Sequence, residues 1–305
     1  MSKTDVSLVI CTYNRCQLLQ QTLDSITRLT VPAGLDWEIL VLDNNSSDDT
    51  PKVADAFTGR LPLRYIFEPR QGKTRALNRA LAEAQGELLC FTDDDVQLAP
   101  TWLEAFVDAA QAYPEAGWFG GPIEPWWPTA RPSWLRDESL PALSAFVVIY
   151  DLGDRVRWYR DGDSPPAGAC MAVRRATFDR IGGYREDLGP NGTTKGTCDD
   201  SELTIRSLQQ GIRGVFVPQA RCLHYVEMDR LRVRDFLRYG IGKGQNQARM
   251  DASCPPGSLW HAATQTVRGL RQAAIGRWDR VLICALNVGV DLGRRRVQSR
   301  RSERA

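Results

Sequence analysis

Short apolar segments alternate with segments of helical periodicity along the first hundred residues. The apolar segments are rich in Val, Ile and Leu, as in strands that are buried on both faces, and they occupy residues 6–11, 37–42, 63–67 and 87–92. Apolar residues recur at helical spacing in residues 15–29 and 73–84, and residues 48–51 (Asp-Asp-Thr-Pro) are typical of a helix start. Repeated strand–helix pairs of this length predict an α/β domain with a mainly parallel central sheet flanked by helices.

The second half of the chain begins with an irregular region. Residues 118–158 contain five of the nine tryptophans and several prolines without regular periodicity, which predicts loops and irregular strands. Regular elements return as a strand at 168–173, a helix at 176–181, a helix at 199–210 closed by Gly211, and a final strand at 214–218. From Asp235 onward the pattern is mostly helical and ends in a basic tail, residues 294–304. We therefore expect boundaries near residues 116 and 246, the second opening a helical C-terminal extension.

Charge and cysteine content narrow the class of protein. The chain has 39 Lys and Arg against 37 Asp and Glu, so it lacks the basic excess of a nucleic-acid-binding protein. No apolar run approaches the roughly 20 residues of a membrane span, and the N-terminus does not have the pattern of a secretion signal. The eight cysteines are scattered without a CxxC pair, which predicts reduced thiols in a cytoplasmic protein. With only two histidines, a His-rich metal site is excluded.

Three successive carboxylates, Asp93, Asp94 and Asp95, follow the fourth predicted strand. Side by side they repel one another, so as a purely structural device they cost stability. Asp93 and Asp95 have the alternate spacing that directs two carboxylates toward one site, and hard cations such as Mg²⁺ or Mn²⁺ prefer oxygen ligands. The alternative is a solvated turn that also caps a helix starting near Pro100.

The first predicted strand is not followed by a glycine-rich loop of the kind that binds phosphate. The turn there reads Thr12-Tyr13-Asn14-Arg15, so a bound nucleoside diphosphate would be met by a metal and by cationic side chains. Arg70 and Lys73 follow the third predicted strand and are candidates, although both also suit a solvated helix start. Asp43 ends the second strand, where an acidic residue contacts the ribose or base in dinucleotide folds, or else belongs to a polar turn.

Further candidates lie in the second half. Asp199 and Asp200 open the predicted helix at 199–210 after glycines 189, 192 and 196. They serve either as helix-capping acids or, for one of them, as a general base. His224 comes just after the strand predicted as the last, where it is either a structural histidine or a third metal ligand.

Taken in chain order, seven segments resemble the family-2 glycosyltransferases, which have the GT-A fold. They are residues 6–15 (VSLVICTYNR), 38–50 (EILVLDNNSSDDT), 72–80 (GKTRALNRA), 88–95 (LLCFTDDD), 168–188 (GACMAVRRATFDRIGGYREDL), 199–211 (DDSELTIRSLQQG) and 215–224. The resemblance spans residues 5–245 and implies a Rossmann-like GT-A domain. It makes residues 1–115 the nucleotide-sugar-binding half, residues 116–245 the acceptor-binding and catalytic half, and residues 246–305 the helical extension.

The resemblance also implies the reaction and the residues that perform it. The reaction is an inverting, divalent-metal-dependent transfer of a sugar from a nucleotide-diphosphate sugar to a hydroxyl of a glycan or lipid-linked acceptor. Asp200 matches the catalytic base, Asp95 the direct metal ligand and His224 a C-terminal metal ligand. The residues assigned to the nucleotide sugar are Thr12, Tyr13, Arg15, Asp43, Arg70, Lys73, Asp93 and Asp94, with Asp93 nearer the ribose. Asp199 departs from the family's usual Glu, and the Gln-x-x-Arg-Trp motif of processive members is absent, which favours single transfers.

Two surfaces remain to be assigned. Trp126 and Trp127 are candidates for acceptor binding because aromatic faces suit sugar rings and lipid carriers, although Trp also fills cores. The basic tail, with the apolar residues 281–290 before it, either lies on the inner face of the cell membrane or forms a packed helix with a solvated end. The sequence gives no indication of an oligomeric state.

Two other classes of function compete with sugar transfer. A sugar-phosphate nucleotidyltransferase shares the α/β layout but would carry a glycine-rich phosphate loop after the first strand, which residues 12–15 do not provide. A non-catalytic nucleotide-sugar or glycan-binding protein would have no need of Asp93, Asp95, Asp200 and His224 together.

Overall fold

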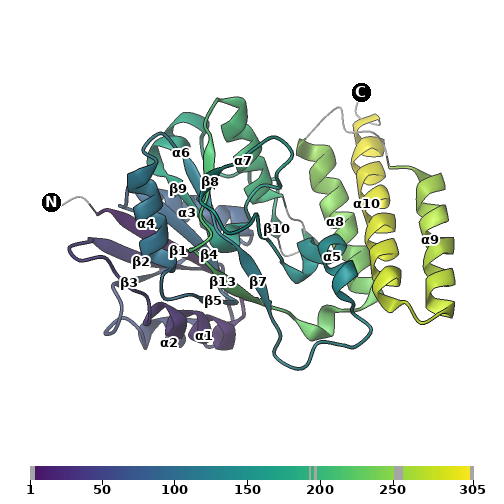
Figure 1. Ribbon diagram of the computed structural model, residues 1–305, viewed down its shortest axis with the longest axis horizontal. Coiled ribbons are helices and arrows are strands. Elements are labelled where there is room, and N and C mark those ends of the chain that lie inside the picture. Colours follow the sequence, from purple (N-terminus) through teal and green to yellow (C-terminus); the bar gives the residue numbers. More distant parts are fainter. Residues whose placement is uncertain (1–3, 192–193, 196–197, 251–256, 303–305) are drawn as a thin grey trace. The chain divides into compact units, whose positions relative to one another are not determined.

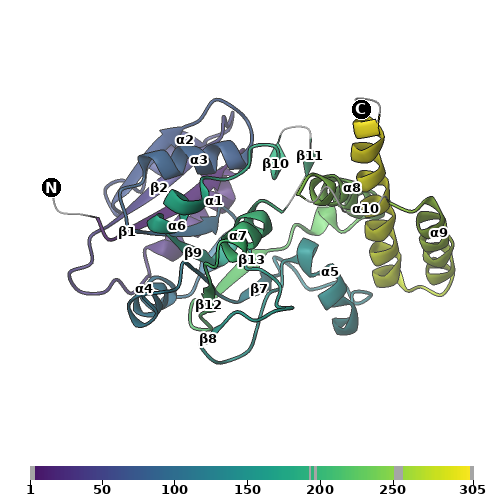
Figure 2. The ribbon, with the colours of Figure 1, turned by 90° about the horizontal axis from the view of Figure 1, so that it is seen from above.

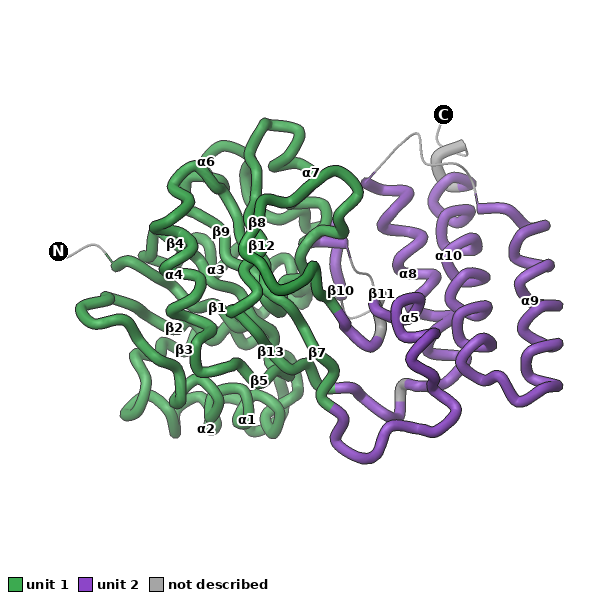
Figure 3. Tube along the Cα trace, in the orientation of Figure 1, with its two compact units in different colours: residues 1–126, 150–186, 200–225 green, residues 127–149, 187–199, 226–305 purple. Residues whose placement is uncertain are grey.

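The chain folds into two compact units. A computed structural model describes residues 4–191, 194–195, 198–250 and 257–302. Unit 1 consists of residues 1–126, 150–186 and 200–225, and unit 2 of residues 127–149, 187–199 and 226–305 (Figure 3).

Unit 1 is built on an eight-stranded sheet in the order β3-β2-β1-β4-β9-β6-β12-β8 (Figure 1). Its strands are β1 (Val6–Thr12), β2 (Trp37–Asp43), β3 (Leu63–Phe67), β4 (Leu88–Asp93), β6 (Trp118–Gly120), β8 (Arg157–Trp158), β9 (Met171–Arg174) and β12 (Gly214–Phe216). Only β8 and β9 run antiparallel to the strands beside them, so the sheet is mainly parallel.

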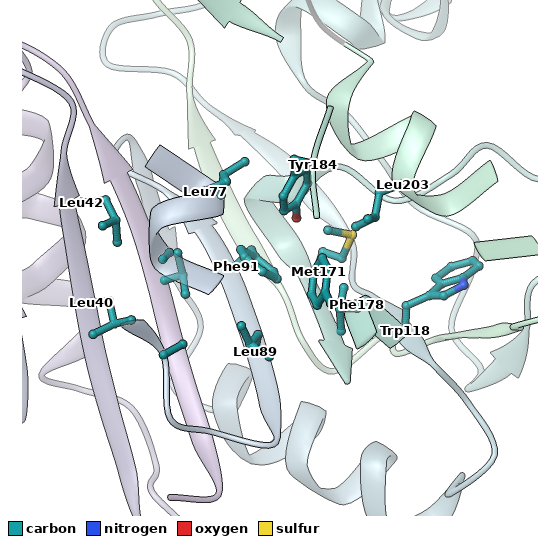
Figure 4. Close-up of a cluster of buried hydrophobic side chains, with 14 of the residues drawn as sticks. Leu40, Leu42, Leu77, Leu89, Phe91, Trp118, Met171, Phe178, Tyr184 and Leu203 are labelled. Carbon is teal, nitrogen blue, oxygen red and sulfur yellow. The ribbon is translucent and has the colours of Figure 1, made fainter. Parts of the chain in front are cut away.

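Helices cover both faces of this sheet. They are α1 (Cys16–Ile26), α2 (Thr50–Asp55), α3 (Lys73–Glu83), α4 (Trp102–Ala112), α6 (Arg175–Ile181) and α7 (Asp199–Gln209). On one face, alternate strand residues such as Leu40, Leu89 and Phe91 pack against Leu77 of α3 and Phe178 of α6 (Figure 4). The intervening residues of β1 and β2 are equally buried, which explains why these strands read as continuous apolar runs.

A second, three-stranded sheet of unit 1 has the order β5-β13-β7. Its strands are β5 (Val96–Leu98), β7 (Ile123–Trp126) and β13 (Cys222–Tyr225). β13 pairs antiparallel with β5 and parallel with β7. Because β5 starts directly after the carboxylates that follow β4, this small sheet joins the acidic turn to a segment far along the chain.

The structure confirms the mainly parallel α/β architecture and corrects the second half in three places. The strand at 214–216 is not the last, since β13 follows it, and His224 lies within β13 rather than beyond a strand end. Residues 168–170 form a short 3₁₀ turn (η2, Gly168–Cys170) before β9. The region 118–158 contains regular strands and a helix as well as loops. These strands are two to four residues long, too short to show a period.

Unit 2 is helical. Its elements are η1 (Asp137–Ser139), α5 (Leu140–Val147), β10 (Pro190–Asn191), β11 (Thr194–Lys195), η3 (Met228–Arg230), α8 (Val233–Met250), α9 (Leu259–Ala274) and α10 (Trp278–Ser302). Leu135 and Leu143 pack with Phe236 of α8 and Leu286 of α10 in one apolar cluster. The predicted helical extension is thus observed. Gly192, Gly196 and the end of the basic tail at 303–304 lie outside the described residues.

Glycines allow α8 and α10 to approach very closely. A Cβ added to Gly240 would lie 2.3 Å from the carbonyl oxygen of Leu286, and one added to Gly289 would lie 2.3 Å from that of Leu237. Leu282 and Leu286 are buried in the same interface. The buried residues of the stretch 281–290 therefore pack within unit 2, while the contact of the basic tail with a membrane stays a prediction.

This close approach reverses the usual effect of a Gly-to-Ala substitution in a helix. Ala normally stabilises a helix interior by about 1 kcal/mol relative to Gly. We expect Gly240→Ala instead to destabilise unit 2 by about 1–3 kcal/mol, because the new methyl group overlaps backbone that cannot move without separating the helices. Urea unfolding followed by circular dichroism measures the change.

Gly269 of α9 provides the matched control. A Cβ at this buried position would lie 3.4 Å from the Cβ of Cys284, an ordinary contact, so Gly269→Ala should leave stability unchanged or raise it. Equal effects of the two substitutions would contradict the role assigned to the α8–α10 contact.

Within the described part of the chain, no helix is long and apolar enough to cross a membrane.

Candidate active site

The carboxyl ends of the parallel strands bring the first group of predicted residues to one edge of the sheet. In the registers of β1 with its two neighbours, Thr12 lies opposite Asp43 and Cys11 lies opposite Asp93. Ligands of open α/β sheets bind at this edge. Sequence position at strand ends was therefore sufficient to place these residues together.

His224 reaches the same edge through the small sheet. It lies opposite Val96 in the β13–β5 pairing, and the backbone N–H of Tyr225 donates to the carbonyl oxygen of Asp95 over 2.8 Å. Its Nε2 is 3.3 Å from Asp95 Oδ1 and 3.9 Å from Asp93 Oδ2. The register of β13 on β5 thus places the imidazole of His224 beside the carboxylates of Asp93 and Asp95.

Two cations hold the carboxylates from the other side. Lys73 Nζ, at the start of α3, donates to Asp93 Oδ1 over 2.7 Å. Arg15 donates to Asp95 Oδ2 over 2.7 Å and to Asp94 Oδ1 over 3.1 Å. These pairs offset the mutual repulsion of three adjacent acids, and they place positive charge beside the carboxylates.

The three acids differ in their electrostatics. Burial alone would raise the pKa of Asp93, but the positive charge of Lys73, together with His224, outweighs it and holds that pKa below its usual value. Burial raises the pKa of Asp94 to about 6, against the opposing effect of Arg15. Asp93 is therefore kept ionised, as a metal ligand must be.

Asp93, Asp95 and His224 have the geometry of a divalent-metal site. Each offers one ligand atom, and these atoms all lie within 4.8 Å of one another. Asp95 Oδ1 is buried and accepts no well-aligned hydrogen bond from the described residues, although the imidazole nitrogen faces it. An oxygen-rich set of two carboxylates and one imidazole fits Mn²⁺ or Mg²⁺. The alternate spacing of Asp93 and Asp95 predicted this convergence.

Asp200, in the first turn of α7, is anchored to η2. The backbone N–H of Gly168 donates to Asp200 Oδ2 over 2.8 Å, and a Cβ on Gly168 would lie 2.6 Å from Asp200 Oδ1. The next residue of η2, Ala169, accepts from Thr92 Oγ1 of β4 over 2.9 Å. The carboxylate of Asp200 is thus tied through η2 to the strand that ends at Asp93.

The remaining nucleotide-pocket candidates have different surroundings. Asp43 is fully buried and accepts from Tyr65 Oη over 2.6 Å and from the backbone N–H of Ser46 over 2.8 Å. Tyr13 is 45% exposed, next to this edge. Arg70 forms its ion pair with Glu68, at 2.9 Å, and not with the carboxylates after β4.

The acceptor candidates are divided between the two units. In unit 1, the ring of Trp126 packs edge-on against Tyr225, with ring centroids 5.2 Å apart. In unit 2, Trp127 packs on the apolar cluster around Leu135, and Asp199 is buried at the first residue of α7.

Sequence reasoning missed two residues that shape the site. Gly168 contacts the carboxylate of Asp200, and Asn44 binds the loop before α3 by accepting from the N–H of Gly72 and donating to the carbonyl of Arg70. The signal for Asn44 was present, since it follows Asp43 at a strand end. Nothing in the sequence around Gly168 indicates which side chain it would meet.

The chain is similar to known proteins in both sequence and fold. Residues 7–182 match the family model described as glycosyl transferase family 2. A glucosyl-dolichyl phosphate glucuronosyltransferase of Haloferax volcanii is 24% identical over 266 residues, covering 83% of this chain and 79% of the relative. An N-acetylglucosaminyl-diphospho-decaprenol L-rhamnosyltransferase of Mycobacterium tuberculosis is 28% identical over 248 residues, covering 73% of this chain and 76% of the relative.

Among solved structures, a mannosyltransferase of Pyrobaculum calidifontis, in complex with GDP-Man and Mn²⁺, has a TM-score of 0.61 at 22% identity. The alignment covers 93% of this chain and 86% of that one. This likeness confirms the expected GT-A fold.

Proposed function

Because the chain belongs to glycosyl transferase family 2, we propose that it transfers single sugars from a nucleotide-diphosphate sugar to a hydroxyl group of a glycan or lipid-linked acceptor, with inversion at the anomeric carbon. The observation that carries this proposal is the convergence of Asp93, Asp95 and His224 beside Lys73 and Arg15. A metal-ligand set bordered by cations is what a nucleoside diphosphate requires in a fold without a glycine-rich phosphate loop.

The chemistry divides among these residues. Asp93, Asp95 and His224 would hold Mn²⁺ or Mg²⁺, which when bound supplies positive charge to stabilise a leaving diphosphate. Lys73 keeps Asp93 ionised, and the ion pairs from Lys73 and Arg15 orient the carboxylates. Asp200 would accept the proton of the acceptor hydroxyl as its oxygen bonds to the anomeric carbon and the bond from that carbon to the phosphate oxygen breaks. A single displacement of this kind inverts the configuration.

The wider setting of the reaction rests on the relatives. Two of them are named for substrates on dolichyl or decaprenyl carriers, which supports a lipid-linked acceptor and a place in surface-polysaccharide or glycolipid assembly at the cytoplasmic face of the membrane. The division into a donor half at residues 1–115 and an acceptor half at 116–245, with Asp199, Trp126 and Trp127 at the acceptor, is part of the same proposal.

Release of nucleoside diphosphate, measured over a panel of nucleotide sugars, tests the proposal. We expect one donor to give release that depends on an acceptor and on Mn²⁺ and is abolished by a chelator. Formation of pyrophosphate from a sugar phosphate and a nucleoside triphosphate would instead identify a nucleotidyltransferase. Tight donor binding without turnover on any lipid-linked or glycan acceptor would identify a binding protein.

Gly168 provides a test of how the base is positioned. We expect Gly168→Ala to lower kcat about 10- to 100-fold with little change in the KM for the donor, because the added methyl group displaces the Asp200 carboxylate while the metal-ligand group is untouched. Steady-state kinetics separates the two constants. Gly59→Ala is the control, since a Cβ there has no atom within 4 Å, and it should leave kcat unchanged. A donor KM that rises in place of a lowered kcat would contradict the positioning role.

A further inference from the structure

Exposed apolar side chains of unit 2 are concentrated on α9 and on the residues that lead from it into the start of α10. Of the thirteen large apolar side chains exposed in the described residues, six lie within residues 259–278: Leu259, Trp260, Val267, Leu270, Ile275 and Trp278. Trp260 is 79% exposed and Leu270 68%. Single exposed apolar residues are ordinary, but a group of this kind on one helix marks an interaction surface.

The group forms a continuous strip along α9. Figures 1 and 2 both show α9 running beside α10. The buried residues of α9, Ala262 and Gly269, are about two helical turns apart and therefore lie on the same side of the helix. By helical spacing, Trp260 and Val267 lie opposite these buried residues and Leu270 lies on the adjoining flank, while Ile275 and Trp278 come after the end of α9. We name this strip, with Arg268 and Arg271 beside it, the α9 face.

The helix that carries the strip is firmly held. Ser258 caps its N-terminus by accepting from the backbone N–H of His261 over 3.0 Å. Asp291 of α10 in turn accepts from the N–H of Ser258 over 3.2 Å and contacts His261 Nδ1 at 2.5 Å. The exposure of the strip is therefore a property of a well-anchored helix and not of a frayed end.

Charge on the α9 face has one sign. Arg268 and Arg271 are exposed, and neither forms an ion pair with any residue in the described ranges. Residues 257–278 contain no Asp or Glu. An apolar strip with tryptophan, bordered by arginines and free of acids, has the composition of a helix that lies in the interface of an anionic membrane.

We propose that the α9 face docks the protein on an anionic lipid surface, with the apolar strip in the headgroup–acyl boundary and Arg268 and Arg271 on lipid phosphates. A second copy of the chain is a poorer occupant, because a two-fold contact through α9 would set arginines against arginines with no acid to pair them. This docking goes beyond the proposed sugar transfer and is independent of it, since membrane contact requires neither donor nor metal.

Vesicle flotation of the full chain, without donor or metal, tests the proposal. We expect binding to vesicles that contain phosphatidylglycerol, weakening as salt is added, and little binding to vesicles of phosphatidylcholine alone. Trp260→Ser combined with Leu270→Ser should weaken binding at least about tenfold by removing apolar area. Arg268→Gln combined with Arg271→Gln should weaken it about 30-fold on the anionic vesicles, since each arginine near the surface contributes roughly fivefold.

Val31→Ser, which removes an exposed apolar side chain from unit 1, is the control and should bind as the unmodified chain does. Circular dichroism shows whether each variant is folded.

Equal binding to both kinds of vesicle, or unchanged binding of the α9 variants, would overturn the proposal. So would a dimer in light scattering that the Trp260 and Leu270 substitutions dissociate without any vesicle binding. Sugar transfer that persists without vesicle binding would refute the docking and leave the proposed function intact.

Discussion

Replacing Asp200 by Asn is expected to lower kcat about 10³-fold, within the range that loss of a general base causes. The amide keeps the size of the side chain and can still accept the hydrogen bond from the N–H of Gly168, so the local structure should persist while the capacity to take a proton is lost. Nucleoside-diphosphate release at saturating donor and acceptor measures kcat.

The affinity for the donor separates this loss from a structural one. Because Asp200 lies outside the metal-ligand group, the Kd of the nucleotide sugar in the presence of Mn²⁺ should change little. Asp55→Asn, an exposed carboxylate at the end of α2, removes the same charge elsewhere and should leave both constants unchanged. An Asp200→Asn enzyme that retained a tenth of the original kcat would show that another group takes the proton.

Replacing Asp95 by Asn is expected to weaken Mn²⁺ binding about 100-fold, and with it the Mn²⁺-dependent part of donor binding. The substitution keeps an oxygen in place but removes the negative charge that a divalent cation requires, and it weakens the pairing with Arg15 by removing the charge of the acceptor. Isothermal titration of the metal alone, and then of the donor with and without the metal, measures both effects.

Asp94 gives the control for this experiment within the same turn. It pairs with Arg15 as Asp95 does but is not part of the group formed by Asp93, Asp95 and His224. Asp94→Asn should therefore keep the Mn²⁺ affinity within a few-fold of the original. If Asp94→Asn and Asp95→Asn weakened metal binding equally, the assignment of Asp95 as the direct ligand would be wrong.

The positions of candidate site residues could be predicted from the sequence wherever those residues lie at the end of a strand. Thr12, Asp43 and Asp93 are the last residues of long apolar strands, and parallel strands bring their carboxyl ends to one edge, so sequence position implied proximity. The mainly parallel sheet and the family were predictable for the same reason, because β1, β2 and β4 are six or seven residues long and mostly buried on both faces.

Contacts that depend on short elements could not be predicted. β5 has three residues and β13 four, so neither shows a period, and their pairing joins segments more than a hundred residues apart. His224 was a candidate because the chain has only two histidines and because this one matches a metal-binding His of the resembled family. Its position within a strand was not predicted. The exposed strip of α9 was missed for a related reason. Its apolar residues predict a helix but do not show which face another helix will cover. The more continuous apolar stretch, residues 281–290, is the one that packs against α8.

The pairing of β13 with β5 also orders events during synthesis of the chain. The strands β1 to β4, with their carboxylates, leave the ribosome long before residue 224, so most of the central sheet can form while the imidazole does not yet exist. The metal-ligand group is completed only when β13 is added beside β5. A chain interrupted before residue 222 therefore carries the acids without their histidine. Tight metal binding is then expected only from chains in which synthesis of unit 1 is complete.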